Sequence, residues 1–230
     1  MFYFDYWYLI FLSPAILLGL WAQFRMRSTY RQALEVPTAL TGAAAARKVL
    51  DSAGLNQVEI EMVPGELSDH YDPRHKVLRL SPDVYGGRTA ASVGVAAHEA
   101  GHALQDAENY SPLVLRNLAV PVAGFGSGAG LWIVFFGAIF SIGPLIWLGI
   151  ALYSCFVAFQ LVNLPVEFNA SSRAKAQLAM LDIADRDQMY HVNRMLNAAA
   201  LTYVAATLSA VMTLLYWLYR LGLLGGSSDE

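Results

Sequence analysis

The segment from His98 to His102 reads HEAGH, and its residue types and spacing could do chemistry. In an α-helix, residues four positions apart lie on one face, so the imidazoles of His98 and His102 can bind a single zinc ion. Glu99 then lies where its carboxylate can act on a water molecule held by that ion. The alternative is a pair of helical histidines that meet other polar groups and bind no metal. The motif therefore indicates a zinc hydrolase, provided that a further ligand exists.

Catalytic zinc sites use three protein ligands and a water molecule, so the two histidines need a partner. The chain lacks the longer pattern HExxHxxGxxH, which excludes a metzincin. Glu167 is a candidate, because it ends a long stretch without acidic residues and follows an apolar segment. A membrane hairpin before it would return the chain to the face of the membrane that it left. The alternative is an interfacial carboxylate that pairs with Arg173 or Lys175.

The composition is that of a membrane protein. Apolar residues make up 56% of the chain and charged residues 14%, and the mean hydropathy is +0.41. A soluble domain carries about 25% charged residues. Gly143-Pro144 is expected to form a hairpin turn between two crossings, and the small residues of GFGSGAG favour close helix contact. The segments that are long and apolar enough to cross a bilayer are 6–24, 119–142, 145–164 and 198–218.

The positive charges predict the orientation. Four crossings put all 15 Lys and Arg residues except Arg220 on one side, which the positive-inside rule assigns to the cytoplasm. A topology in which 89–105 is itself a crossing divides these charges more evenly, so it is disfavoured. We expect a multi-pass protein of the cytoplasmic (inner) cell membrane with its catalytic segments in the cytoplasm. The expected division is 1–24, 119–164 and 198–224 in the membrane, 25–118 and 165–197 in the cytoplasm, and a tail at 225–230.

The polar segment 25–118 predicts a small α+β unit. Thr41 can cap a short helix. Alternating apolar and polar residues predict two paired strands at 58–63 and 76–81, and the second strand could bind an extended peptide along its edge. The turn-rich stretch 64–75 is expected to be a loop between them.

An alanine-rich helix over 89–105 is expected to carry the HEAGH motif. Gly101 lies inside this helix, where glycine costs about 1 kcal/mol relative to alanine. The sequence therefore suggests that the helix backbone closely approaches a neighbour at Gly101.

Three segments carry a family resemblance, namely VAAHEAGHALQ, LSDHYDP and LPVEFNASSRA. Through them, and over almost its whole length, the chain resembles the bacterial membrane-bound neutral zinc metallopeptidases of the YugP type. More distantly, EFNA after HExxH is similar to the gluzincins of the CAAX prenyl protease and HtpX group. The resemblance implies a mainly α integral membrane protein with about four transmembrane helices and a small cytoplasmic α+β, zincin-like catalytic part.

The resemblance also implies roles for individual residues. Glu99 is the expected catalytic glutamate. The expected ligands of one Zn²⁺ ion per chain are His98, His102 and Glu167. The broader group has an aspartate where this chain has Ser171, which leaves open whether Asn169 or Ser171 supports a ligand histidine.

Several polar side chains of the cytoplasmic segments could stabilise the transition state, and the sequence does not choose among them. For Arg194 the alternative is a basic anchor at the start of the fourth crossing. For His191 it is an ordinary surface position. The candidates are His70, Tyr71, His191 and Arg194.

The expected function is zinc-dependent hydrolysis of peptide bonds at the cytoplasmic face of the membrane. An intramembrane protease that cuts transmembrane substrates and a non-enzymatic metal-binding scaffold are the alternatives. The expected partners are a peptide or membrane-protein substrate and the lipid bilayer, and small-residue helix faces allow a homo-oligomer. The net charge of −3 and the scattered basic residues give no sign of nucleic-acid binding.

Overall fold

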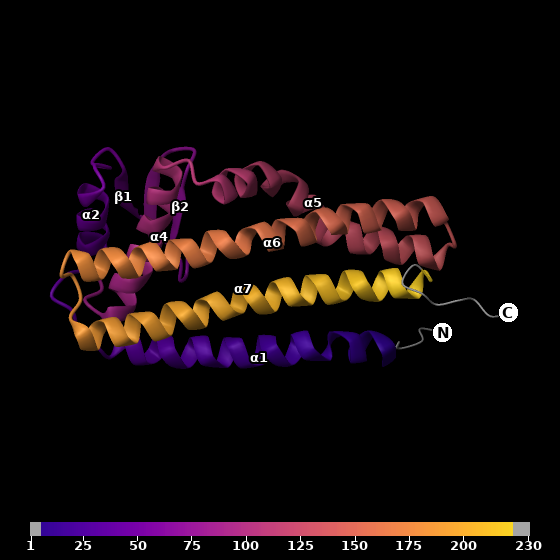
Figure 1. The fold of residues 1–230 in the computed structure, drawn as a ribbon, viewed down its shortest axis with the longest axis horizontal. Helices are drawn as coiled ribbons and strands as arrows, with labels where there is room; N and C mark the ends of the chain where they lie inside the picture. The colour runs from indigo at the N-terminus through magenta and orange to yellow at the C-terminus, as the bar shows by residue number, and fades with distance from the viewer. Residues whose placement is uncertain (1–5, 223–230) are drawn as a thin grey trace. The chain divides into compact units, whose positions relative to one another are not determined.

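The computed structural model describes residues 6–222, and the fold is mainly helical with one small sheet. The described residues form two compact units. The first contains 6–21, 115–164 and 202–222, and the second contains Ala22–Val114 and Pro165–Leu201. The elements in chain order (Figure 1) are α1 (Tyr6–Leu34), α2 (Gly42–Ser52), β1 (Glu59–Met62), β2 (His70–Asp72), β3 (Val77–Leu80), α3 (Pro82–Gly86), α4 (Ala90–Ala107), α5 (Ser111–Ile139), α6 (Gly143–Met180) and α7 (Arg186–Arg220).

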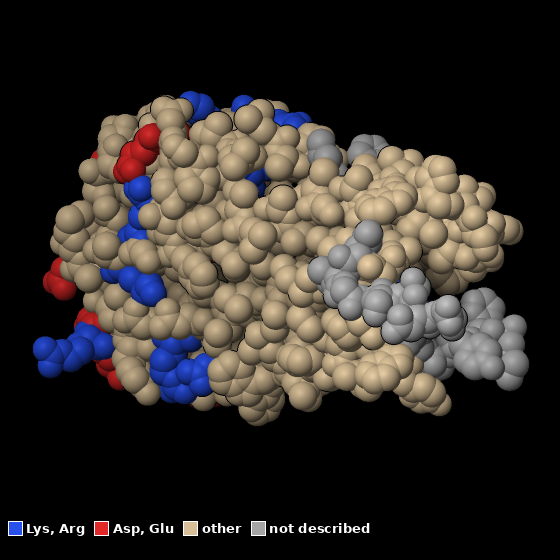
Figure 2. Space-filling view, turned by 45° about the vertical axis from the view of Figure 1, so that its right-hand side comes forward, with Lys and Arg blue, Asp and Glu red and all other residues tan. Residues whose placement is uncertain are grey.

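The first unit is almost free of charge. Among its described residues, Arg116 and Arg220 are the only Lys, Arg, Asp or Glu, and its helices present a largely uncharged surface in Figure 2. Large apolar side chains such as Trp7, Leu17 and Trp132 are more than half exposed. An exposed apolar surface of this extent is typical of helices that face lipid.

Three described helices are long and apolar enough to cross a membrane, namely α1, α6 and α7. Within α5, the apolar stretch whose side chains are all described is Gly128–Ile139. The motif helix α4 is not among the three, which argues against the topology in which 89–105 spans the bilayer. The first five residues of the expected first segment and the expected tail at 225–230 lie outside the described residues.

Small residues join α5 to α6 within the first unit. A Cβ atom added at Gly137 would lie 2.8 Å from a side-chain carbon of Ile146, and one at Gly149 would lie 2.7 Å from the carbonyl oxygen of Gly130. The close helix contact expected from GFGSGAG is therefore present. The hairpin turn itself lies just before Gly143, where Ser141 has a φ of 56°.

The second unit holds the sheet, α2, α3 and α4. Thr41 caps α2 as expected, because its hydroxyl accepts a hydrogen bond from the amide of Ala44 at 3.2 Å. The alanines of α4 allow close packing on α2 and on α7. The centre of this core is formed by fully buried side chains from several elements, including Val49, Leu50, Leu78, Leu80, Val93, Leu178, Val192 and Met195.

The sheet differs from the expectation in two ways. The strands predicted at 58–63 and 76–81 do pair, in parallel, as β1 and β3. The stretch predicted as a loop contains a third strand, β2, which runs antiparallel to β3. The strand order β1-β3-β2 therefore puts β3 in the middle. The prediction that this strand binds a peptide along its edge is wrong, because both of its edges are already paired.

Candidate metal centre

The HEAGH segment lies on α4, as the sequence predicts. Thr89 caps this helix, since its hydroxyl accepts a hydrogen bond from the amide of Ser92 at 3.2 Å. His98 and His102 are one turn apart, and the centroids of their rings lie 4.9 Å from each other. The two imidazoles therefore meet on one face of the helix, as joint ligation requires.

Gly101 lets α4 approach α6. A Cβ atom added at Gly101 would lie 2.6 Å from the carbonyl oxygen of Ala170, which is closer than such atoms can come. A larger residue at this position would therefore push the two helices apart. The close backbone contact suggested by the sequence is confirmed. This contact sets the separation between α4, which carries the histidines, and α6. Glu167 lies on α6 one turn before Ala170.

Glu167 faces both histidines from α6. Its Oε2 atom lies 3.3 Å from Nε2 of His98 and 3.7 Å from Nε2 of His102. Among the described residues, these three are the group that could hold a metal ion, and their ligand atoms lie within 4.8 Å of one another. Two imidazole nitrogens and one carboxylate oxygen are a donor set that catalytic zinc uses, with a fourth position for water. The residues therefore fit a zinc ion.

The carboxylate of Glu167 also affects the pKa of His102. Burial alone would lower the pKa of His102, because a charged imidazolium is poorly solvated inside a protein. The hydrogen bond to Glu167 and the charges of Glu99 and Glu167 outweigh burial, and they raise the pKa of His102. Protons and a metal ion compete for this ring, since a ligand imidazole must be neutral.

Gln105 determines which nitrogen of His102 carries hydrogen. Its side chain is fully buried, and its Nε2 donates to the carbonyl oxygen of Val166 at 2.8 Å and to Oδ1 of Asn169 at 2.9 Å. A carbonyl only accepts, so Oε1 of Gln105 must face His102. Oε1 lies 3.0 Å from Nδ1 of His102, and Nδ1 is therefore the donor. The Nε2 atom of His102 keeps its lone pair on the side of Glu167, as metal ligation requires.

Ser171 supports the other histidine. Its hydroxyl lies 3.1 Å from Nδ1 of His98, and it follows Glu167 by one turn of α6. Asn169, the other candidate for this role, contacts neither imidazole among the described residues. It accepts hydrogen bonds from Gln105 and from Nε of Arg173 at 2.7 Å. Ser171 thus contacts His98 directly, whereas Asn169 is connected to His102 through Gln105.

The alternative role for Glu167, a pair with Arg173 or Lys175, is not formed in the structure. Arg173 instead makes a two-pronged pair with Glu108, with both N–O distances at 2.6 Å. This pair lowers the pKa of Glu108. Lys175 donates to Oδ1 of Asn197 at 3.0 Å. The Arg173–Glu108 pair ties α6 to the C-terminal end of α4, close to the metal-binding group.

Tyr71 contacts Glu99 through its backbone. Its amide donates to Oε2 of Glu99 at 3.2 Å, while its hydroxyl donates to Oδ2 of Asp106 at 2.9 Å. Burial, followed by the hydrogen bond to Asp106, raises the pKa of the Tyr71 hydroxyl. Tyr71 therefore orients the glutamate of the motif, and its hydroxyl is already engaged elsewhere.

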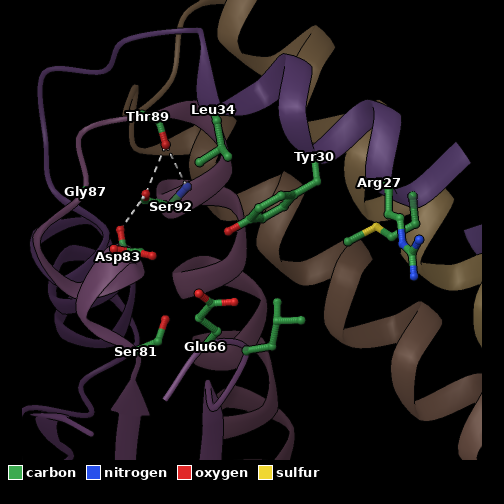
Figure 3. A pocket seen from close by; sticks show the side chains of 11 residues that line it. Arg27, Tyr30, Leu34, Glu66, Ser81, Asp83, Gly87, Thr89 and Ser92 are labelled. Atoms are coloured by element: carbon green, nitrogen blue, oxygen red, sulfur yellow. Dashed lines mark hydrogen bonds between the residues drawn. The ribbon is translucent and has the colours of Figure 1, made fainter. Parts of the chain in front are cut away.

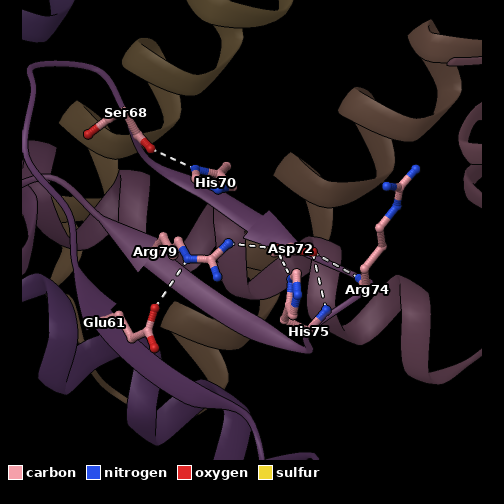
Figure 4. Close-up of polar contacts among 7 residues, drawn as sticks. All are labelled: Glu61, Ser68, His70, Asp72, Arg74, His75 and Arg79. Carbon is pink, nitrogen blue, oxygen red and sulfur yellow. Dashed lines mark hydrogen bonds and ion pairs between the residues drawn. The ribbon is translucent and has the colours of Figure 1, made fainter. Parts of the chain in front are cut away.

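A charged cluster holds β2 in the sheet (Figure 4). Asp72 accepts hydrogen bonds from Nη1 of Arg79 at 2.5 Å and is paired with Nδ1 of His75 at 2.7 Å. Arg79 also pairs with Glu61 on β1 at 3.2 Å. His75 first, and then Arg79, lower the pKa of Asp72. The cluster connects all three strands and so fixes Tyr71 beside Glu99.

The other residues proposed as transition-state partners have contacts with residues outside the metal-binding group. His70 is exposed, and its Nδ1 lies 2.7 Å from the carbonyl oxygen of Ser68. Arg194 stacks on the ring of Tyr190 and donates to its hydroxyl at 3.2 Å, and His191 packs against the same ring. Within the part of the chain that the structure describes, none of these three contacts the metal-binding histidines or Glu167.

Comparisons with known proteins agree with this geometry. Residues 8–222 match the model of a family described as "Putative neutral zinc metallopeptidase". The chain belongs to this family. It is also 47% identical over 209 residues to "Putative membrane protease YugP" of Bacillus subtilis (strain 168), which covers 90% of this chain and 93% of the relative. No solved structure matches the chain significantly. The expectation of a zinc metallopeptidase is thereby confirmed.

Sequence reasoning missed Gln105 in this zinc metallopeptidase. Gln105 lies three residues after His102, so it is on the same face of α4. An amide side chain at that spacing from a histidine of the motif was a usable signal. The fixed orientation of its side chain depends on Val166 and Asn169, which come from a distant part of the sequence and could not be inferred from spacing.

Proposed function

We propose that the protein is a membrane-embedded zinc-dependent endopeptidase whose site consists of His98, His102, Glu167 and Glu99. The observation that carries the proposal is the meeting of two imidazoles and a buried carboxylate beside Glu99 in a chain of this family. His98, His102 and Glu167 hold one zinc ion per chain. Glu99 acts as the general base and acid of the reaction.

A zinc ion bound by these ligands supplies Lewis acidity, which polarises the scissile carbonyl and lowers the pKa of the attacking water to about 7. Glu99 accepts the proton of that water and delivers it to the leaving amine. The amide of Tyr71 holds one oxygen of the Glu99 carboxylate at 3.2 Å and leaves the other for proton transfer. Gln105 and Ser171 hold the ligand imidazoles in place.

We further propose four crossings, with α5 as the second, and a site at the cytoplasmic face of the membrane. The nearly uncharged first unit and its exposed apolar side chains support the crossings. The concentration of Lys and Arg outside that unit supports the orientation through the positive-inside rule. Tagging each terminus and testing its accessibility in intact cells examines the arrangement, because both termini should be extracytoplasmic.

The test of the catalytic proposal compares Glu99→Gln with Glu167→Ala. The first variant should retain one zinc ion per chain and lose proteolysis by a factor of about 1,000 or more, since it keeps the ligands and removes the base. The second should lose zinc as well as activity. Glu59→Gln, which removes an exposed carboxylate on β1, is the matched control and should change neither.

The possible outcomes separate the alternatives. Zinc at one ion per chain with no cleavage of any peptide by the wild-type protein would indicate a metal-binding scaffold. Cleavage confined to transmembrane segments would indicate an intramembrane protease. Unchanged zinc affinity in Glu167→Ala would reject Glu167 as the third ligand.

A further inference from the structure

A concave site lies in the same compact unit as the metal-binding group. It is a cavity of about 510 Å³, and none of His98, Glu99, His102 or Glu167 lines it. Its walls come from the C-terminal part of α1, the chain between β1 and β2, α3 and the start of α4 (Figure 3). A cavity of this size can enclose a large side chain together with ordered water.

The lining combines apolar and acidic groups. Met26, Leu34 and Leu67 supply apolar surface, and the latter two are themselves exposed rather than packed in the core. Glu66 and Asp83 supply carboxylates. A long aliphatic side chain with a charged end matches this combination, because its stem can cover apolar surface while its head reaches polar groups.

The acidic and basic side chains lie on opposite sides of the cavity (Figure 3). In Figure 3 the hydroxyl of Tyr30 points into the cavity on the side of Glu66 and Asp83, and Arg27 lies on the opposite side. A cationic group near Tyr30 would have two carboxylates and a hydroxyl as partners. An anionic group there would meet two like charges. The chemistry of the acidic end therefore selects for a cation.

Two chain segments connect this cavity to Glu99. Ser92 lines the cavity and precedes Glu99 by seven residues, so both lie on nearly the same face of α4, separated by about 10 Å along its axis. Glu66 and Leu67 lead directly into β2, where the Tyr71 amide donates to Glu99. An extended peptide covers about 10 Å with three residues.

We propose that this cavity is a specificity site of the peptidase, which binds a Lys or Arg side chain of the substrate about three residues from the scissile bond. The proposal rests on the proposed function, because it assigns the cavity to the same substrate. Glu66 and Asp83 bind the cationic head, Tyr30 donates or accepts beside it, and the apolar side chains contact the stem.

The test uses the full-length, zinc-loaded protein in detergent and pairs of synthetic peptides that differ only by lysine or norleucine at one position. Norleucine keeps the aliphatic stem and lacks the amine. Binding is measured by mass-spectrometric quantification on the immobilised Glu99→Gln protein, which should not cleave the peptides. The same measurement is made with Glu66→Gln and Asp83→Asn added. Glu59→Gln with Asp187→Asn, two exposed carboxylates that do not line the cavity, is the matched control for the loss of two charges.

Lysine peptides should bind roughly fivefold more tightly than their norleucine partners, and the cavity variant should abolish the difference while the control keeps it. Equal binding of the paired peptides, or a preference that survives the cavity variant, would overturn the proposal. Cleavage of the same peptides by the wild-type protein tests catalysis separately. If no peptide is cut while the carboxylate-dependent preference persists, the proposed function fails and the binding site stands. If the cleaved bonds do not lie at a fixed distance from the lysine, the cavity does not bind a side chain of the cleaved substrate, and the proposal fails.

Discussion

Nδ1 of His102 lies 3.0 Å from Oε1 of Gln105, and the amide of Gln105 is held in this orientation by the Val166 carbonyl at 2.8 Å. A backbone carbonyl on α6 thus decides the tautomer of a histidine on α4. The buried amide of Gln105 accepts from Nδ1 of His102 and donates to α6, so Nε2 of His102, which faces Glu167, is left with its lone pair.

Replacement of Gln105 by Leu should therefore weaken zinc binding by about 10- to 100-fold, as is usual when the partner of a ligand histidine is removed. Gln105→Glu keeps an acceptor for Nδ1 and should recover part of the affinity. Competition with a chromogenic chelator measures both. Equal affinity of Gln105→Leu and wild type would mean that the tautomer is set by another group.

Gly101→Ala should destabilise the fold by about 1–3 kcal/mol, because the new methyl group would be forced against the carbonyl of Ala170. Gly19→Ala on α1 is the control, since an added Cβ there meets nothing within 4 Å. That variant should be neutral or more stable, as alanine is the better helix former. Thermal unfolding in detergent compares the two, and similar shifts in both would contradict the close-contact argument.

Tyr71→Phe should leave the turnover rate within a few-fold of wild type, because the hydroxyl bonds to Asp106 and only the backbone amide reaches Glu99. The loss of a half-buried hydrogen bond should lower the free energy of unfolding by about 1 kcal/mol. Steady-state kinetics with a cleaved peptide measures the first effect. A loss of activity by two orders of magnitude would instead identify the hydroxyl as a transition-state partner.

Asp72→Asn should lower the stability of the fold by about 1 kcal/mol near neutral pH. The pKa of Asp72 is depressed in the folded state by His75 and Arg79, so its stabilisation is present above the ordinary carboxyl value of 3.8. That stabilisation is lost as the pH falls further, through the folded-state pKa. The difference between wild type and variant should therefore shrink in acid, as the pH falls below the ordinary carboxyl value. Denaturant unfolding over a pH series checks the trend, and a gap that widens in acid would contradict it.

Zinc should stabilise the wild-type protein and have little effect on Glu167→Ala. At a free concentration 100 times the dissociation constant, a ligand that binds only the folded state adds about 2.7 kcal/mol. The shift of the unfolding temperature with added zinc, after removal of metal by a chelator, measures this. Equal shifts in both proteins would place the ion elsewhere.

Much of the site could be predicted from the sequence, because its main signals are local. HEAGH has helical spacing, Thr41 and Thr89 have cap chemistry, and Gly101 stands out among alanines. The meeting of Glu167 with the histidines depends on two helices that are distant in sequence. The position of Glu167 after the expected membrane hairpin made it the candidate, with a pair with Arg173 or Lys175 as the alternative, and the family resemblance implied its role as the third ligand.

The sheet was the least predictable part of the fold. The strand at His70–Asp72 is three residues long and precedes Pro73, so its sequence indicates a turn. Its position is set by contacts with Arg79 on β3 and with Glu99 on α4. Tertiary contacts of this kind override local preference, and they also explain why β3 became the central strand.

The contact between Gly101 and Ala170 has a consequence for how the metal is acquired. Because the two helix backbones touch there, and hydrogen bonds hold both imidazoles, packing positions the candidate ligands before any ion is bound. Little conformational entropy is then lost on loading, in contrast to small zinc domains whose folding depends on the metal. We therefore expect a zinc ion to bind here with little rearrangement of the surrounding helices.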